Sequence, residues 1–404
     1  MTDEDDDFRY APVDTLPGLI QRGRGLGAVW AEREPAAAAA VALACVRRDT
    51  RWDWQVDDRH GYLAGLLDRS AVPLEPLLEQ LAGDQEECER GFRVLELLAL
   101  RGSVEAREAL RDHVRHGPWW QDVLCSLADC WPPEWWDDLA EDAVRRLDGG
   151  RPEWPNSRPW LRWRQALAPE SRTALRRHRH RIGPTDAELI AVLRDADASR
   201  AERGAAVVTL AGRPGVSELI PLVPDLASAD GQRPLPLLGR AVERVGAPAL
   251  AAAREWAADD RPWLAWLGLG VLARHGERED LPRLLRELER CWGERRWCGP
   301  DLLADGLGRF GAAAGEAEAV LGRYWLHTPH SYERPSYLRA LVAIRPGAVD
   351  ALLYESLWDC EPAARLLAVE RAPDGTELRR RLSELRDDPA EQAEVRAAAA
   401  ARLG

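Results

Sequence analysis

The sequence contains no lysine, a single methionine and only three phenylalanines among 404 residues, so arginine carries every fixed positive side-chain charge. Without lysine, the chain cannot form a phosphate-binding loop of the Walker type. No apolar run approaches the roughly 20 residues that cross a bilayer. The first residues, MTDEDDDF, are acidic where a secretory signal is basic. We therefore expect a cytoplasmic protein without membrane association.

The net charge of −13 argues against sequence-independent binding to nucleic acid, because neutralising phosphates requires a basic surface. The same charge suits a basic protein partner. Seven scattered cysteines, an odd number, are typical of reduced thiols. The pairs His113 with His116 and His327 with His330 belong to no HExxH or paired CxxC pattern. We expect neither a bound metal nor a cofactor.

The pattern of apolar residues predicts helices throughout. Alternating runs typical of β-strands are almost absent. Apolar residues instead recur every three or four positions, as in FRVLELLAL (92–100) and DLPRLLRELERCW (280–292). Short segments rich in glycine, proline and aspartate separate these runs.

Internal repetition gives the organisation of the helices. The segments 204–227 and 267–289 share one plan, in which a helix of small residues ends at glycine and a second helix opens with Ile-Pro or Leu-Pro. Glycine suits such an end because it adopts the left-handed conformation at little cost. The glycines placed to end first helices are Gly102, Gly212, Gly246, Gly276, Gly311 and Gly347. From Gly212 onward they recur roughly every 30 to 36 residues, which indicates a helical solenoid.

This pattern resembles the HEAT-repeat superfamily, including the PBS-lyase-like HEAT repeats, over most of residues 86–404. The resemblance implies an all-α, right-handed solenoid of antiparallel helix pairs whose concave face binds another macromolecule. One segment breaks the rhythm, with nine arginines against two glutamates between Arg151 and Arg181. We therefore expect an N-terminal half-solenoid over 1–149, a basic junction rich in arginine and tryptophan over 150–183, and C-terminal HEAT-like repeats over 184–404.

The stretch RWDWQVDDRH (51–60) concentrates two tryptophans and three aspartates, and it has two interpretations. In the first, a helix begins near residue 51, and its acidic first turn favours the positive end of the helix dipole. One face of that helix then holds Trp52, Val56, Leu63 and Leu67.

In the second interpretation the stretch is a site. The segment WDWQVD resembles the Trp/Asp motif of the AlkD-like DNA glycosylases, which are themselves HEAT-like. The resemblance implies that Trp54 or Trp52 stacks on a damaged, cationic base. It also implies that Asp57 stabilises the positively charged sugar as the glycosidic bond breaks.

Eighteen tryptophans provide a further candidate surface. Adjacent pairs in GPWWQD (117–122) and WPPEWWDD (131–138) cannot both face one core, so at least one member of each pair is expected at a surface or groove. Large rigid aromatic residues are typical interface anchors. The predicted anchors and the acids that complement a basic partner are Trp119, Trp120, Trp135, Trp136, Asp137, Asp138, Glu141 and Asp142.

The basic segment LRRHRHRIG (175–183) is a candidate anion-binding surface. Arginines beside aromatic residues can bind phosphate or nucleic acid. They can equally pair with acids of a neighbouring repeat or of a second copy. The arginines concerned are Arg176, Arg177, Arg179 and Arg181.

The sequence thus favours a non-catalytic scaffold or adaptor that binds a basic protein or peptide on a concave surface. Two alternatives remain open. One is a HEAT-fold enzyme similar to the DNA glycosylases for alkylated bases, with Trp54 and Asp57 in the active site and the arginines of 151–181 lining the same groove. The other is an inhibitor or immunity-type protein for a basic partner.

Overall fold

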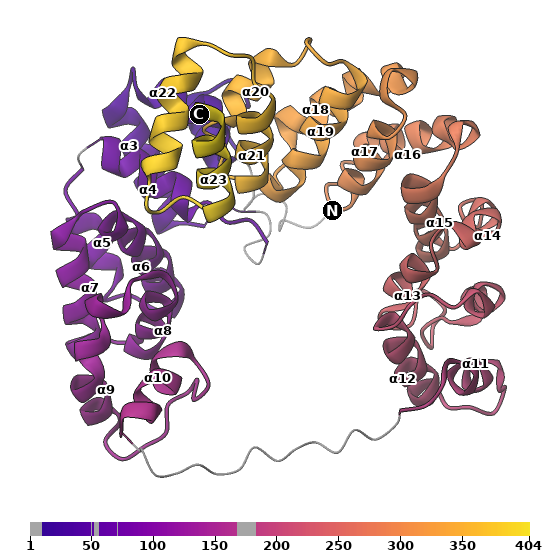
Figure 1. The fold of residues 1–404 in the computed structure, drawn as a ribbon, viewed down its shortest axis with the longest axis horizontal. Helices are drawn as coiled ribbons and strands as arrows, with labels where there is room; N and C mark the ends of the chain where they lie inside the picture. Colours follow the sequence, from indigo (N-terminus) through magenta and orange to yellow (C-terminus); the bar gives the residue numbers. More distant parts are fainter. Residues whose placement is uncertain (1–9, 50, 52–55, 71, 168–182) are drawn as a thin grey trace. The chain divides into compact units, whose positions relative to one another are not determined.

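The computed structural model describes residues 10–49, 51, 56–70, 72–167 and 183–404 (Figure 1). These residues form helices joined by turns, and no β-strand occurs among them beyond an isolated bridge between Ala227 and Pro234. The all-α class predicted from the apolar spacing is confirmed. Within the described part of the chain, no helix is both long and apolar enough to cross a membrane.

The first 167 residues form ten α-helices within the described part of the chain. They are α1 (Leu16–Gln21), α2 (Gly25–Ala31), α3 (Pro35–Arg47), α4 (His60–Arg69), α5 (Glu75–Gln80), α6 (Gln85–Leu100), α7 (Val104–His116), α8 (Trp120–Cys130), α9 (Ala140–Leu147) and α10 (Arg158–Leu167). Two short 3₁₀ helices, η2 (Pro133–Trp135) and η3 (Asp137–Leu139), connect α8 to α9.

The remaining described residues continue the helical order. The α-helices are α11 (Asp186–Arg194), α12 (Arg200–Ala211), α13 (Leu238–Val245), α14 (Leu250–Trp256), α15 (Pro262–His275), α16 (Leu281–Gly293), α17 (Pro300–Gly308), α18 (Glu318–His327), α19 (Arg334–Ile344), α20 (Asp350–Ser356), α21 (Pro362–Arg371), α22 (Thr376–Asp387) and α23 (Ala393–Leu403). The 3₁₀ helices are η4 (Ser217–Asp225), η5 (Ala247–Ala249), η6 (Arg278–Asp280), η7 (Gly311–Ala317) and η8 (Ser331–Glu333).

The chain divides into two compact units. Unit 1 comprises Met1–Ala174, Leu326–Pro335 and Val349–Gly404, and unit 2 comprises Leu175–Trp325 and Ser336–Ala348. This division differs from the sequence segments 1–149, 150–183 and 184–404, because the last helices pack against the first ones rather than only against their neighbours in sequence.

Helix α2 joins these distant parts of unit 1 by packing on α20. Both Nε and Nη2 of Arg24 donate to the Glu355 carboxylate at 2.8 Å. Figure 1 shows the first helices, in indigo, beside the last ones, in yellow. An ion pair between Arg101 and Asp388 adds a further link, with a shortest distance of 3.0 Å.

We expect Gly25→Ala to destabilise unit 1 by about 1–3 kcal/mol, as overpacking of a tight contact does. A Cβ at Gly25 would lie 1.8 Å from the backbone oxygen of Glu355, which cannot move without displacing α20. The measurement is the free energy of unfolding in urea. Gly204→Ala is the matched control, since its Cβ enters open space within α12 and should be neutral or slightly stabilising. Equal stability of both variants would contradict this packing.

In unit 2, contacts link alternate helices as well as consecutive ones. Helix α13 contacts α15, and α15 contacts α17, while α14 packs on α15 and α16 packs on α17. Of the six glycines predicted to end first helices, Gly311 and Gly347 do not, because α17 ends at Gly308 and α19 at Ile344. Gly246 caps α13 at φ 70°, and Gly102 follows α6 at φ 107°. Gly212 and Gly276 also end helices, but with negative φ. Pro282 lies in the first turn of α16, as the Leu-Pro pattern predicts.

The helix predicted from about residue 51 is wrong. Helix α4 begins at His60, and the described residues 51 and 56–59 are not helical. Leu63 and Leu67 are buried, as predicted, but Val56 is 48% exposed. The physical reason is that the Asp57 carboxylate is hydrogen-bonded to the distant segment at Ser331, which holds this part of the chain outside a helix. Trp52 lies outside the described residues.

Candidate functional site

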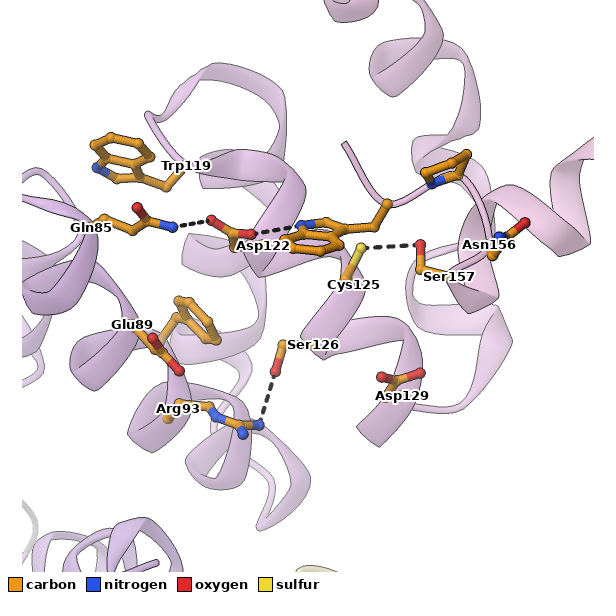
Figure 2. Close-up of a pocket in the computed structure, with 13 residues that line it drawn as sticks. Gln85, Glu89, Arg93, Trp119, Asp122, Cys125, Ser126, Asp129, Asn156 and Ser157 are labelled. Carbon is orange, nitrogen blue, oxygen red and sulfur yellow. Dashed lines mark hydrogen bonds between the residues drawn. The ribbon is translucent and has the colours of Figure 1, made fainter. Parts of the chain in front are cut away.

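A cleft of about 700 Å³ lies in unit 1 between α6, α8 and the segment 154–157 (Figure 2). Local sequence signals determine where the helices that line the cleft begin. Helix α6 begins with a capping box, in which the Asp84 side chain accepts from the Glu87 amide and the Glu87 side chain accepts from the Asp84 amide. The turn from α7 into α8 contains Gly117 and Pro118, which do not favour continuation of α7.

Trp119 and Trp154 line the cleft with exposed rings. They are 43% and 55% exposed, and they are the exposed tryptophans among the described residues. The Trp119 indole N–H points to the Gly83 carbonyl at 3.4 Å, and that of Trp154 donates to Asp122 at 3.1 Å. Hydrogen bonds thus orient both rings while much of their apolar surface stays in contact with solvent.

Trp119 has a left-handed backbone, with φ 50° and ψ 23°, immediately before α8. Such a conformation costs a bulky residue about 1–3 kcal/mol, and it tends to occur at functional sites. The preceding loop holds Trp119 there: Arg146 donates to the Gly117 carbonyl at 2.7 Å, and His113 Nε2 lies 2.6 Å from the Pro118 oxygen. In this conformation the Trp119 ring lines the cleft.

The cleft is negatively charged. Figure 2 shows Glu89 on the α6 side and Asp122 and Asp129 on α8. Asp122 accepts hydrogen bonds from Gln85 and Trp154, both at 3.1 Å. Glu89 and Asp129 are exposed, and neither forms a hydrogen bond or ion pair through its carboxylate with another described residue.

One arginine, Arg93, occurs among the described residues that line the cleft. Its guanidinium already binds Glu96 and Ser126, each at 3.3 Å. Glu96 is buried, and this burial raises the pKa of its carboxyl. Against this single arginine, the lining of the cleft holds the three acids Glu89, Asp122 and Asp129.

The first predicted tryptophan pair divides as expected: Trp119 is exposed and Trp120 is buried. The Trp120 ring lies under the Arg146 guanidinium at 4.9 Å. In the second pair, Trp136 is fully buried and Trp135 is half-buried, with the Arg107 guanidinium 5.0 Å from its ring centre. Of the four predicted anchors, Trp119 therefore presents the most accessible ring.

The acids predicted to meet a basic partner are largely paired within the chain. Asp137 binds Arg162 at 2.6 Å and Asp138 binds Arg111 at 2.6 Å, and these hydrogen bonds lower the pKa of both carboxyls. Asp142 lies 2.8 Å from Arg145 and also pairs with Arg115. Glu141 is exposed. Because three of these four acids are paired with arginines, they carry less unpaired negative charge than the acids of the cleft.

Asp57 is fully buried rather than open to a substrate. Its Oδ1 accepts from the Ser331 amide at 2.7 Å and from the Ser331 hydroxyl at 2.9 Å, and its Oδ2 lies 3.4 Å from His330 Nδ1. The same hydroxyl contacts the Glu361 carboxylate. Asp57 therefore fixes one segment of unit 1 to another.

The other predicted site residues are placed as follows. Trp54 and the four arginines Arg176, Arg177, Arg179 and Arg181 lie outside the described residues. Where residues are described, no group of three or more histidine, cysteine, aspartate or glutamate side chains is arranged to hold a metal ion. Sequence reasoning missed Glu89, Asp122 and Asp129 as site residues. Their spacing is that of ordinary exposed helix residues, so only the packing of α6 against α8 identifies them.

No family model, curated protein or solved structure matches this chain.

Proposed function

We propose that the protein is a non-catalytic, cytoplasmic scaffold or adaptor that binds a basic protein or peptide in the cleft of unit 1. The observation that carries the proposal is the combination of two exposed tryptophans with carboxylates that have no internal cation. Exposed aromatic rings provide binding energy, and the negative charge selects a basic segment.

A HEAT-like solenoid is the architecture we propose for this scaffold. The contacts of α4 with α6 and of α6 with α8, together with those of α13 with α15 and α15 with α17, suit stacked helix pairs. The glycine-ended first helices support the same arrangement.

The chemistry of the cleft supports binding rather than catalysis. Its cysteine, Cys125, donates to the Ser157 hydroxyl at 3.2 Å, and burial raises the pKa of the thiol. A protonated thiol is a poor nucleophile. The glycosylase alternative gains no support from Asp57, because a fully buried and hydrogen-bonded carboxylate cannot approach a nucleotide.

The test is affinity capture from native lysate, before and after nuclease treatment, with the wild-type protein and with the double variant Trp119→Ser, Trp154→Ser. We expect a stoichiometric, nuclease-resistant protein with a basic segment on the wild type, reduced at least tenfold on the variant. The matched control is Val144→Ser, Val208→Ser, which removes exposed apolar side chains elsewhere.

Equal capture by the wild type and the tryptophan variant would overturn the proposal. Recovery of nucleic acid alone, lost at high salt, would also overturn it and would favour the nucleic-acid alternative.

A further inference from the structure

Arginine, tryptophan and a carboxylate form a recurring arrangement in this protein. Arg261 is bonded to Asp259 at 2.8 Å, and its guanidinium lies 5.6 Å from the centre of the Trp263 ring. Similar geometry recurs in unit 1, where Arg162 pairs with Asp137 and lies 5.9 Å from the Trp136 ring.

A third example in unit 2 joins Arg296 to Glu294 and to the Trp266 ring, at 3.4 Å and 5.6 Å. The guanidinium is suited to both contacts, because it is planar, weakly hydrated and able to hydrogen-bond a carboxylate while it lies on an aromatic ring. The fold thus uses one chemical arrangement in both units.

The cleft contains two parts of this arrangement and lacks the third. Neither Trp119 nor Trp154 has a guanidinium or another aromatic ring in contact with it among the described residues. Glu89 and Asp129 provide carboxylates without a cation, and the oxygens of Asp122 are oriented by hydrogen bonds from Gln85 and Trp154. Arg93 does not fill the gap, because its carboxylate partner is Glu96 rather than an acid of the cleft, and it lies over neither tryptophan ring among the described residues.

We infer that the cleft binds the guanidinium of an arginine side chain presented by the partner, stacked on Trp119 or Trp154 and paired with the carboxylates of Glu89, Asp122 or Asp129. This inference rests on the proposed function and names the group that the site recognises.

The inference distinguishes arginine from lysine. An ammonium group is compact and strongly hydrated, so it loses more hydration on entering a cleft and does not stack as a plane on indole. The cleft volume of about 700 Å³ far exceeds that of one guanidinium, which leaves room for the residues on either side of the arginine.

The experiment uses the full chain labelled with 5-fluorotryptophan and three capped peptides, Gly-Ser-Arg-Arg-Ser-Gly and its lysine and citrulline counterparts. Binding is followed by fluorine NMR, with the Trp119 and Trp154 resonances assigned from Trp119→Phe and Trp154→Phe. We expect the arginine peptide to shift one or both resonances and to bind at least fivefold more tightly than the lysine peptide. Citrulline, which is nearly isosteric but neutral, should not bind detectably.

Charge variants test the carboxylates without disturbing the core, since Glu89 and Asp129 are exposed. We expect Glu89→Gln, Asp129→Asn to weaken binding of the arginine peptide about tenfold. The control Glu105→Gln, on the exposed start of α7, should leave the affinity unchanged.

The results that would overturn this inference differ from those that would overturn the proposed function. Equal binding of arginine and lysine peptides would overturn the guanidinium inference, yet tryptophan-dependent capture of a basic protein would still support the scaffold. Arginine binding that shifts neither the Trp119 nor the Trp154 resonance would overturn the site. The chain could also associate with itself in a concentration-dependent way that Trp119→Ser, Trp154→Ser abolishes. That result would overturn the inference of a separate partner, because the arginine would then come from a second copy of the chain.

Discussion

Arg334→Met is expected to lower the free energy of unfolding of unit 1 by about 3–5 kcal/mol, the usual cost of removing one member of a buried ion pair. Arg334 is fully buried, and its Nε and Nη2 donate to the two oxygens of Asp359 at 2.9 and 2.8 Å. It also donates to the Arg22 carbonyl at 2.8 Å and the Gly23 carbonyl at 3.2 Å. Methionine would leave the buried Asp359 carboxylate without its cation and the Arg22 carbonyl without the Arg334 donor, whereas the Gly23 carbonyl would keep the Cys360 amide.

The measurement is urea denaturation, with hydrogen exchange at α2 and α20 to locate the loss. Arg339→Met is the matched control, because Arg339 and Asp305 form an exposed pair, with side chains 51% and 45% exposed. Such a pair contributes about 0–1 kcal/mol. The double variant Arg334→Met, Asp359→Leu should recover much of the loss, since it removes the unpaired charge. A loss below about 1 kcal/mol in Arg334→Met would contradict the arrangement.

The free energy of unfolding is expected to fall less steeply in Glu361→Gln than in the wild type as pH rises from about 5 to 8. Burial raises the pKa of the Glu361 carboxyl from 4.5 to about 7. Between those two values the folded state holds a proton that the unfolded state has released, so stability falls as pH rises. The difference corresponds to up to about 3 kcal/mol.

The geometry around Ser331 supports a protonated Glu361 carboxyl. One hydroxyl lies within hydrogen-bond distance of both Asp57 and Glu361, and a hydroxyl donates a single hydrogen. If Ser331 donates to Asp57, Glu361 satisfies the second contact by donating its own proton.

The measurement compares urea denaturation of the wild type and Glu361→Gln at several pH values. His113 titrates in the same window, and because burial lowers its pKa, it makes stability rise with pH. His113 is present in both proteins, so their difference isolates Glu361. Parallel stability curves for the two proteins from pH 5 to 8 would contradict a protonated Glu361.

Local features of the fold were predictable from the sequence because they depend on neighbouring residues. The glycine at the end of α13 and the proline in the first turn of α16 are examples. Asp57 was not predictable, since its partner Ser331 lies 274 residues away. An isolated WDWQVD segment carries no information about that contact, so the helix interpretation, which local residues favoured, was wrong.

The state of the predicted acids was missed for a related reason. Asp138 is bound by Arg111, 27 residues earlier, and Asp280 is bound by Arg254, 26 residues earlier. Arg365 binds Glu391 over the same interval of 26 residues. These ion pairs join residues 26 or 27 positions apart, so neighbouring residues do not reveal them. Glu89 was inconspicuous because sequence spacing does not show which acid an arginine binds: Arg115, 26 residues after Glu89, pairs with Asp142 instead.

The discontinuity of unit 1 has a consequence for the time course of synthesis. Arg24 binds Glu355, and 331 positions separate them in the chain. At translation rates of about 5–20 residues per second, Arg24 emerges roughly 20 to 60 s before its partner. During that interval α2 lacks the surface of α20 that covers it, and all of Leu175–Trp325 is made. Unit 1 thus stays incomplete for most of the synthesis of the chain, and chaperone binding should fall once α20 leaves the ribosome.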